Sequence, residues 1–284
     1  MTITTDRYIN LFTDFGFKKL FGEEPNKDLL IALLNDLLGN KEHITDLTYL
    51  KNERLPETEG DRRAVYDLYC SNDRGEKFIV EVQRAKQEHF KDRSIYYSTF
   101  AIQEQARRGR EWAYELKGVY TIAIMDFVFD ERYPDKYEHR IKLMDEENHV
   151  VFWDKLTFVY LEIPKFNKEL SDLQNDFERW LYAFRNLHRL RHMPKELETA
   201  IFKKLFEVAE IASMDDIERD NYQESLKEYR DLKAALDTSF KEGKEEGRKE
   251  GTIQIARAML KQGESIDKII QYTGLTQDEI EVLR

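Results

Sequence analysis

Cysteine is almost absent from this sequence, because Cys70 is the only one among 284 residues. A single thiol excludes an internal disulfide framework and a zinc site built from several thiolates, and it fits a reducing compartment. The N-terminal residues lack a basic segment followed by an apolar run, and no apolar stretch is long enough to span a bilayer. We therefore expect a cytoplasmic protein without a membrane partner.

Two well-known enzyme motifs are also missing. No phosphate loop of the form GxxxxGK followed by Ser or Thr occurs, and the six histidines show no HExxH spacing. ATP-driven work and zinc-dependent catalysis are therefore not supported. Hydrophobic residues nevertheless make up 41% of the chain, which is enough for a sizeable core.

An overall positive charge is lacking as well. The formal net charge of −11 argues against a whole surface that binds nucleic acid through basic residues. A local cluster of bases is nevertheless present, formed by Arg84, Lys86, Lys91, Arg93, Arg107, Arg108 and Arg110. The alternative interpretation of this cluster is a solvated helix face, because charge on exposed helices is common.

Hydrophobic periodicity predicts an α/β order of elements over the first 165 residues. A short helix containing Phe17 and Phe21 is expected to be capped by Asp14, and a second helix should end at Gly39. A third, longer helix is expected at about 89–108. The expected strands are Ile44–Leu50, Ala64–Cys70, Lys77–Gln83, Val119–Phe129, Ile141–Met144 and Thr157–Ile163. This order is typical of an α/β sandwich with a mixed sheet.

The remainder of the chain is expected to be helical. Residues 171–235 carry apolar stripes at helical spacing, and core packing is the expected role of their aromatic side chains. In Lys241–Gly251 three glycines stand four apart among charges, which favours a semi-flexible linker, since each glycine costs a helix about 1 kcal/mol relative to alanine. The alternative is a helix whose glycine edge packs closely on another helix. The last residues resemble a helix-turn-helix with a capping box at Thr276, although a small assembly or packing module is the favoured interpretation over DNA reading.

Three polar residues on two neighbouring strands form the candidate site. Side chains alternate along a strand, so Glu81 and Gln83 share one face while Val82 points to the other. A hairpin centred on Arg74 pairs positions whose numbers sum to 148, which sets Asp67 opposite Glu81 with β-carbons about 4.5 to 5.5 Å apart. The sequence therefore predicts a carboxylate pair.

Two carboxylates side by side repel each other unless a cation lies between them. Mg²⁺ prefers hard oxygen ligands and keeps several waters, which leaves room for substrate phosphate oxygens. Such a site suits phosphodiester hydrolysis. The alternative is an exposed pair that simply interacts with nearby Arg or Lys side chains.

The combined pattern resembles the Rpn family of recombination-promoting nucleases, also called PD-(D/E)xK nuclease family transposases. The resemblance is carried by Phe17-Lys18, Leu20-Phe21, the segment Leu33 to Gly39, Asp67, Gly75 and Val80-Glu81-Val82-Gln83. It continues through Tyr96-Tyr97-Ser98, Gln103, Gly109, Gly118-Val119, Ile122, Ile124 and the glycine-spaced segment near the C-terminus. The family has a restriction-endonuclease-like core, here expected at 1–165, followed by a helical extension at 166–240 and a linker with a small helical module at 241–284.

The resemblance implies specific roles for the residues of the carboxylate pair. Asp67 and Glu81 would bind Mg²⁺, or Mn²⁺ as a substitute, with the Val82 carbonyl as a further ligand. Gln83 takes the position that lysine holds in the wider superfamily, and a neutral amide cannot supply that positive charge. Lys86, which directly follows the strand, is expected to supply part of the missing positive charge.

The resemblance also implies a DNA partner, in double-stranded form, and a role in recombination or mobile-element biology. The residues expected to contact DNA are Lys86, Arg93, Tyr97, Gln103 and Arg107. A second hypothesis is a catalytically weak or inactive protein that binds DNA or forms homo-oligomers through its C-terminal region. Cleavage of RNA by the same chemistry is a third.

Overall fold

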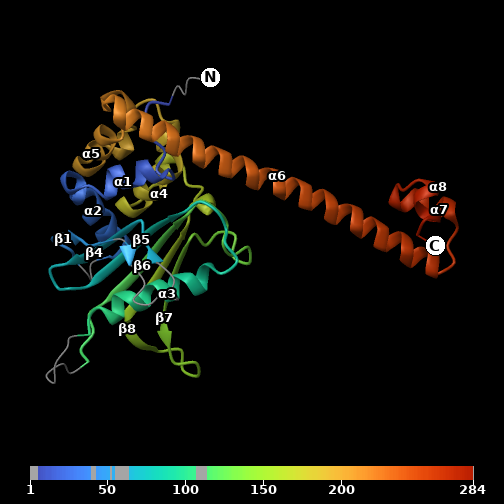
Figure 1. Ribbon diagram of the computed structural model, residues 1–284, viewed down its shortest axis with the longest axis horizontal. Coiled ribbons are helices and arrows are strands. Elements are labelled where there is room, and N and C mark those ends of the chain that lie inside the picture. Colours follow the sequence, from blue (N-terminus) through green and yellow to red (C-terminus); the bar gives the residue numbers. More distant parts are fainter. Residues whose placement is uncertain (1–5, 40–42, 52, 55–63, 107–113, 284) are drawn as a thin grey trace. The chain divides into compact units, whose positions relative to one another are not determined.

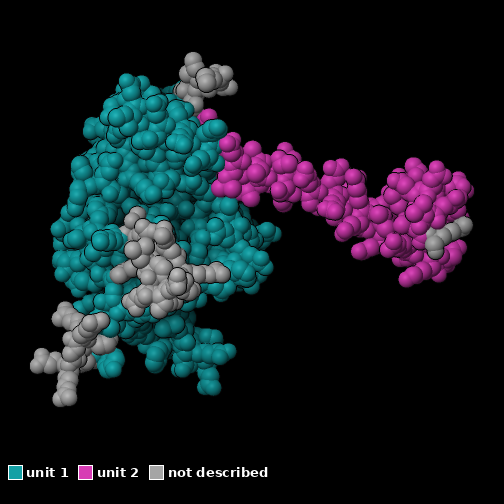
Figure 2. Space-filling view, in the orientation of Figure 1, with its two compact units in different colours: residues 1–229 teal, residues 230–284 magenta. Residues whose placement is uncertain are grey.

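The computed structural model describes residues 6–39, 43–51, 53–54, 64–106 and 114–283. The chain divides into two compact units, residues 1–229 and residues 230–284 (Figure 2). The first unit contains the sheet, and the second contains most of the longest helix and the last two helices. No described helix combines the length and apolar character needed to cross a bilayer.

A six-stranded mixed sheet forms the centre of the first unit (Figure 1). Its strands, in spatial order, are β1 (Leu47–Tyr49), β4 (Leu68–Asn72), β5 (Lys77–Gln83), β6 (Val119–Met125), β8 (Val151–Glu162) and β7 (Glu138–Met144). Strands β5, β6 and β8 are parallel, and the other neighbours are antiparallel. A separate two-stranded ladder joins β2 (Glu53–Arg54) and β3 (Ala64–Val65). The predicted mixed α/β core is confirmed.

Helices cover both faces of this sheet. They are α1 (Asp14–Phe21), α2 (Lys27–Leu38), α3 (Phe90–Gln103), α4 (Asp176–Asn186), α5 (Ala200–Val208) and the first turns of α6 (Asp216–Lys261), whose Tyr222 and Leu226 join the core. Short 3-10 turns lie at Glu24–Asn26, Ile163–Lys165, Leu170–Asp172, Leu187–Arg189, Lys195–Leu197 and Ile211–Ser213. Helices α1, α2, α4 and α5 share the main apolar core with one face of the sheet, whereas α3 packs on the other face through Ala101. The central strand β6 is buried at every residue, as its apolar run predicts.

The ends of the first two helices follow local capping chemistry. Helix α1 is capped by Thr13, whose hydroxyl accepts the Gly16 N–H at 3.0 Å, so the expectation that Asp14 is the cap is wrong. Asp14 is instead the first helical residue, where its carboxylate pairs with Lys18 four residues later at 2.9 Å. Helix α2 ends at Gly39 with φ +74°, as predicted.

The helices that follow the sheet pack into the same core as the sheet. Trp180, Phe184 and Phe202 are at most 1% exposed and belong to the main apolar cluster. The Trp180 indole N–H donates to Asp36 of α2 at 2.8 Å, which ties α4 to the N-terminal helices. The expected packing role of these aromatic side chains is therefore confirmed, while the three-part division at residues 165 and 240 stays a prediction.

The glycine-spaced segment 241–251 is helical, so the expectation of a semi-flexible linker is wrong. Helix α6 runs without a break from Asp216 to Lys261 (Figure 1). Helix already formed on both sides removes the nucleation cost. The pairs Lys241–Glu245 and Glu245–Lys249 have the i, i+4 spacing at which opposite charges stabilise a helix, which offsets part of the glycine cost. Ala256 near the end of α6 packs with Ile269 of α7 (Ile266–Thr273) and Ile280 of α8 (Gln277–Glu281). The predicted capping box at Thr276 is confirmed.

Candidate active site

The hairpin of β4 and β5 has the predicted register. Leu68 pairs with Val80 and Tyr69 with Ile79, so paired positions sum to 148, and the ladder ends at Leu68, one residue after Asp67. The expected strand Ala64–Cys70 is interrupted, because β4 begins only at Leu68. At the interruption the Asp67 side chain accepts the Val82 N–H at 2.8 Å, which places this carboxylate against β5.

Glu81 and Gln83 lie together on the α3 face of the sheet, as strand alternation predicts. Both side chains are buried, with 6% and 8% exposure. The Gln83 Nε2 group donates to Glu81 Oε2 at 2.8 Å. Val82 points to the opposite face and joins the main apolar core. The sequence-predicted trio Asp67, Glu81 and Gln83 is therefore brought into one small region.

Arg93 of α3 reaches this region from the covering helix. Its Nη2 group donates to Gln83 Oε1 at 2.6 Å and lies 3.9 Å from Glu81 Oε2. The guanidinium also stacks over the Tyr97 ring, 5.8 Å from its centroid. The Arg93 guanidinium lies closer to the Gln83 amide than to the Glu81 carboxylate. The positive charge beside Glu81 therefore comes from α3.

The surroundings of the pair raise the pKa of both carboxyls. The pKa of Glu81 is raised to about 7 by burial first and by the charge of Asp67 second, while Arg93 and Gln83 act in the opposite direction. Burial also raises the pKa of Asp67, against a lowering contribution from the Val82 N–H. A buried carboxyl with a pKa near neutrality is a typical feature of functional sites.

The other residues predicted to contact DNA have varied surroundings. Lys86 is exposed in the loop after β5, and Gln103 is exposed at the end of α3. Tyr97 is half-buried and packs edge-on against Tyr66, with ring centroids 5.3 Å apart. Arg107 lies outside the described residues. Lys86, the expected replacement for the missing lysine, forms no hydrogen bond with Gln83, whereas Arg93 does.

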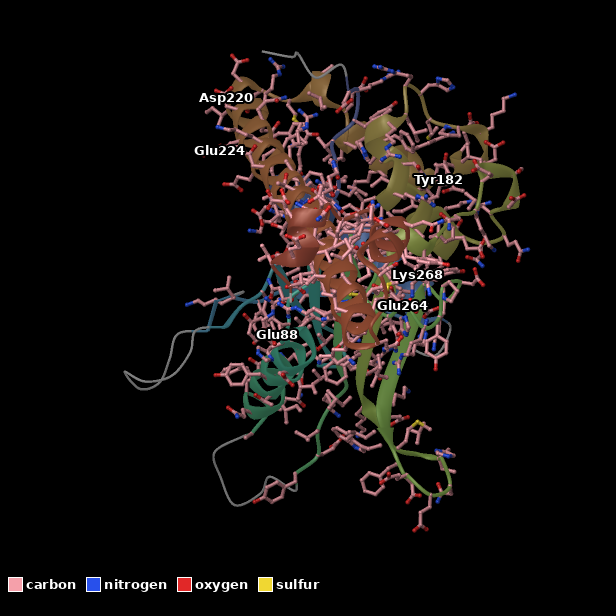
Figure 3. The ribbon with its side chains drawn as sticks, turned by 90° about the vertical axis from the view of Figure 1, so that its right-hand side faces the viewer. Glu88, Tyr182, Asp220, Glu224, Glu264 and Lys268 are labelled. Atoms are coloured by element: carbon pink, nitrogen blue, oxygen red, sulfur yellow. The ribbon has the colours of Figure 1, made fainter. Side chains whose placement is uncertain are left out.

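An open cavity of about 690 Å³ beside Asp67 contains residues that the sequence analysis missed. Asp14, Lys18 and Arg84 line it together with Asp67, and α6 contributes residues that include Glu224 (Figure 3). Asp14 raises the pKa of Asp67, whereas Lys18 and Arg84 lower it. Neither Glu81 nor Gln83 lines this cavity. Lys18 belongs to the Phe17-Lys18 pair, which carries part of the family resemblance. This pair was the sequence signal that could have identified Lys18 as a site residue.

The donor set suits a hard divalent cation that keeps part of its water shell. Within the described chain, no three side chains of His, Cys, Asp or Glu are grouped as a metal cage. Asp67 and Glu81 supply two carboxylates whose mutual repulsion raises the pKa of Glu81. Two carboxylates completed by water are how proteins commonly hold Mg²⁺. The residues present therefore fit such an ion.

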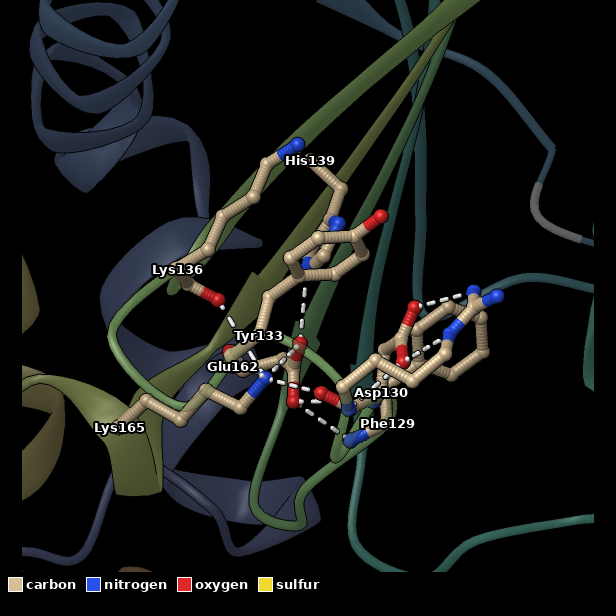
Figure 4. Close-up of polar contacts among 8 residues, drawn as sticks. Phe129, Asp130, Tyr133, Lys136, His139, Glu162 and Lys165 are labelled. Atoms are coloured by element: carbon tan, nitrogen blue, oxygen red, sulfur yellow. Dashed lines mark hydrogen bonds and ion pairs between the residues drawn. The ribbon is translucent and has the colours of Figure 1, made fainter.

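A second buried glutamate, Glu162 at the end of β8, has a different environment (Figure 4). Its carboxylate accepts hydrogen bonds from Lys165 Nζ at 2.8 Å and from the Phe129 N–H at 2.6 Å. His139 Nε2 lies 2.6 Å from Oε1, the oxygen that also accepts from Lys165. Lys165 also donates to the carbonyls of Asp130 and Tyr133, so this cluster fastens the loop after β6 to β8.

Comparison with protein families assigns both parts of the chain. Residues 249–284 match the model of the Rpn/YhgA-like nuclease family C-terminal HTH domain. The helix-turn-helix resemblance is therefore confirmed, although the sequence favoured a packing module, and DNA reading by these helices stays a prediction. Comparison with curated proteins and with solved structures gives no significant match. Residues 11–239 match the model named PD-(D/E)XK nuclease family transposase. Since this match covers most of the chain and includes Asp67, Glu81 and Gln83, the chain belongs to the PD-(D/E)XK nuclease family transposases.

Proposed function

We propose that this protein is a cytoplasmic, Mg²⁺-dependent endonuclease that hydrolyses phosphodiester bonds in double-stranded DNA during recombination or mobile-element activity, with Mn²⁺ as a substitute metal. The observation that carries the proposal is the pair formed by Asp67 and buried Glu81, whose pKa of about 7 reflects burial and a second negative charge. This pair lies within the nuclease-family match. Residues 1–165 would form the nuclease core.

Each residue of the site has a distinct proposed role. Asp67 and Glu81 would hold the ion through carboxylate oxygens, with the Val82 carbonyl as a further ligand. When bound, the ion would lower the pKa of a coordinated water and neutralise charge on the phosphate. Gln83 holds Glu81 through its amide N–H groups and accepts from Arg93, so it keeps both neighbours in position.

Arg93 would supply the positive charge that lysine provides at position 83 in the wider superfamily. Its guanidinium is always charged and can pair with a phosphate as well as with Gln83. Lys86, Tyr97, Gln103 and Arg107 are proposed to extend the DNA contact along α3 and its flanking loops. Lys18 and Arg84, which line the cavity beside Asp67, are added to this surface. Such backbone contacts make binding salt-dependent and insensitive to base sequence.

The test is a plasmid nicking assay with Mg²⁺ and with chelator. Asp67→Ala should abolish nicking, and Asp67→Asn is the sharper variant because its amide oxygen can still accept the Val82 N–H. Asp92→Asn makes the same chemical change at an exposed position of α3 and serves as the matched control. Equal nicking by Asp67→Asn and the unchanged protein would refute the site.

Gln83 favours a second candidate function, a nuclease fold that binds DNA with little or no turnover. Its amide is engaged on both sides by Glu81 and Arg93, and it carries no charge. In that case Asp67→Asn would leave DNA affinity unchanged or increase it, while no condition would give nicking. Competition between DNA and RNA substrates would decide which nucleic acid is preferred.

A further inference from the structure

Part of helix α6 is exposed on every side. Each residue from 234 to 250 is classed as exposed, although this stretch is one continuous helix (Figure 1). It contains Gly243 and Gly247, with Gly251 next, and glycine is the least favourable helix residue after proline. Helices in proteins gain most of their stability by packing an apolar face. Within the described chain, this stretch has no such packing.

An apolar stripe follows one side of this exposed helix. Its members are Leu232, Leu236, Phe240, Gly243, Gly247 and Gly251. At 3.6 residues per turn these positions fall within about 100° of the helix circumference. Phe240 is 72% exposed, and a Cβ added to any of the three glycines would meet no atom within 4 Å. Between Leu236 and Gly247 the stripe is therefore exposed in a single chain.

The two flanks of the stripe carry opposite charges. Lys241, Lys244 and Arg248 lie on one flank, which also holds Asp237, and Glu242, Glu246 and Glu250 lie on the other. The flanks contain like charges four residues apart, such as Lys244 with Arg248 and Glu246 with Glu250, which destabilise an isolated helix. None of these six side chains has an ion pair within the described chain.

The charge pattern distinguishes between the two orientations of a helix pair. In a parallel pair related by a two-fold axis, the basic flank of each helix faces the acidic flank of the other. In an antiparallel pair each flank faces its own kind, so bases oppose bases over much of the contact. We infer that residues 232–251 of α6 form a parallel, in-register pair with the same residues of a second copy of this chain.

The glycines have a physical role in this pair. Because they lack side chains, two helix backbones can approach closely along Gly243, Gly247 and Gly251. The stripe repeats after about 11 residues, from Leu232 to Gly243 and from Phe240 to Gly251, a period that gives a right-handed rather than left-handed supercoil. If the proposed nuclease activity holds, pairing places two Asp67/Glu81 sites in one particle, one for each strand of DNA.

The first test measures the mass of the full-length protein by light scattering after size exclusion, with chelator present. We expect twice the 34.0 kDa of one chain at micromolar concentration. Gly247→Leu should reduce the mass to that of one chain, because its side chain separates the backbones. This substitution also raises helix propensity, so loss of pairing would not reflect an unfolded helix. Thr238→Leu adds the same side chain to the outer face and should leave the dimer intact.

The second test determines orientation by disulfide cross-linking. Leu236→Cys alone should form a chain-to-chain disulfide in a parallel pair, and so should Gly247→Cys alone. In an antiparallel pair these two variants would cross-link only when mixed, since position 236 would then face 247. The native Cys70 is buried and does not interfere.

Each result decides the inference. A monomeric full-length protein, a mass other than that of a dimer, or a dimer that tolerates Gly247→Leu would overturn the pairing. Cross-linking only in the mixture would overturn its parallel orientation. Neither measurement depends on metal or DNA, so failure here leaves the proposed nuclease activity untouched, and absence of nicking leaves the pairing untouched.

Discussion

Glu81 and Glu162 are both buried near the carboxyl ends of parallel strands, yet their surroundings differ. Glu162 is fully buried and receives Lys165, His139 and the Phe129 N–H, all within 2.8 Å. Glu81 has one amide donor at 2.8 Å and an arginine only at 3.9 Å, and its pKa is raised to about 7. A buried carboxylate with a full set of donors stabilises the fold, whereas one with few donors is available to a cation or substrate.

The largest expected difference between the two glutamates is in catalysis. Glu81→Gln should reduce DNA cleavage by at least about 10²-fold, the typical effect of removing one strong electrostatic group from an active site. Glu162→Gln should change cleavage much less, because Glu162 belongs to the fastening cluster. Initial rates of plasmid nicking measure both effects. Comparable losses in the two variants would remove the functional distinction between them.

The second largest difference is in stability. Glu162→Gln leaves the buried Lys165 ammonium without its anionic partner, and breaking a buried ion pair in this way costs about 3 to 5 kcal/mol. The free energy of unfolding in urea, measured without metal at neutral pH, should fall accordingly. Glu81→Gln provides the comparison, since it removes no close ion pair. Unchanged stability in Glu162→Gln would show that the cluster does not fasten the loop.

The third difference depends on pH. The pKa of Glu81 is raised from 4.5 to about 7, so the folded state binds this proton more tightly than the unfolded state. The wild-type protein should therefore lose stability relative to Glu81→Gln as pH rises from about 4.5 to about 7, by at most about 3 kcal/mol. Urea unfolding of both proteins with chelator at pH 5 and pH 8 gives this value. A pH-independent difference would contradict the raised pKa.

The smallest expected effect separates Arg93 from Lys86. Arg93 lowers the pKa of Glu81, so Arg93→Gln should shift the pH profile of cleavage to higher pH and reduce the rate about tenfold. Lys86→Ala should leave the pH profile of cleavage unchanged. The slope of DNA affinity against salt concentration should fall by the amount that about one phosphate contact contributes. Cleavage rates across pH and binding across salt measure the two effects. A shifted profile in Lys86→Ala would instead support Lys86 as the missing charge.

Local features of the chain were predictable because their causes are local. The Asn72 to Gly75 turn determines the hairpin register, and Asp67 lies directly before the ladder, where its side chain accepts the Val82 N–H. The capping box at Thr276 and the stop at Gly39 are likewise local. The conformation of 241–251 was not predicted, because helix propagation from both sides outweighs the local glycine cost.

Contacts between distant segments were beyond pattern analysis. Arg93 reaches Gln83 only because α3 packs across β5, and its sequence position alone allowed a solvated helix face. Asp14 and Lys18 line the cavity at Asp67 through the packing of α1, more than 40 residues away in sequence. The helices after β8 bury their aromatic side chains against α1 and α2, and the apolar stripes of these helices could not name those partners.

Sequence alone determined that Glu81 and Gln83 share one face of β5 and that β4 pairs with β5 in this register, because strand alternation and hairpin register depend on neighbouring residues and on turn chemistry. Only the tertiary structure decided how deeply Glu81 is buried and which cation approaches it. Burial and the charges of Asp67 and Arg93 set the pKa of that carboxyl, and these charges come from the segment before β4 and from α3.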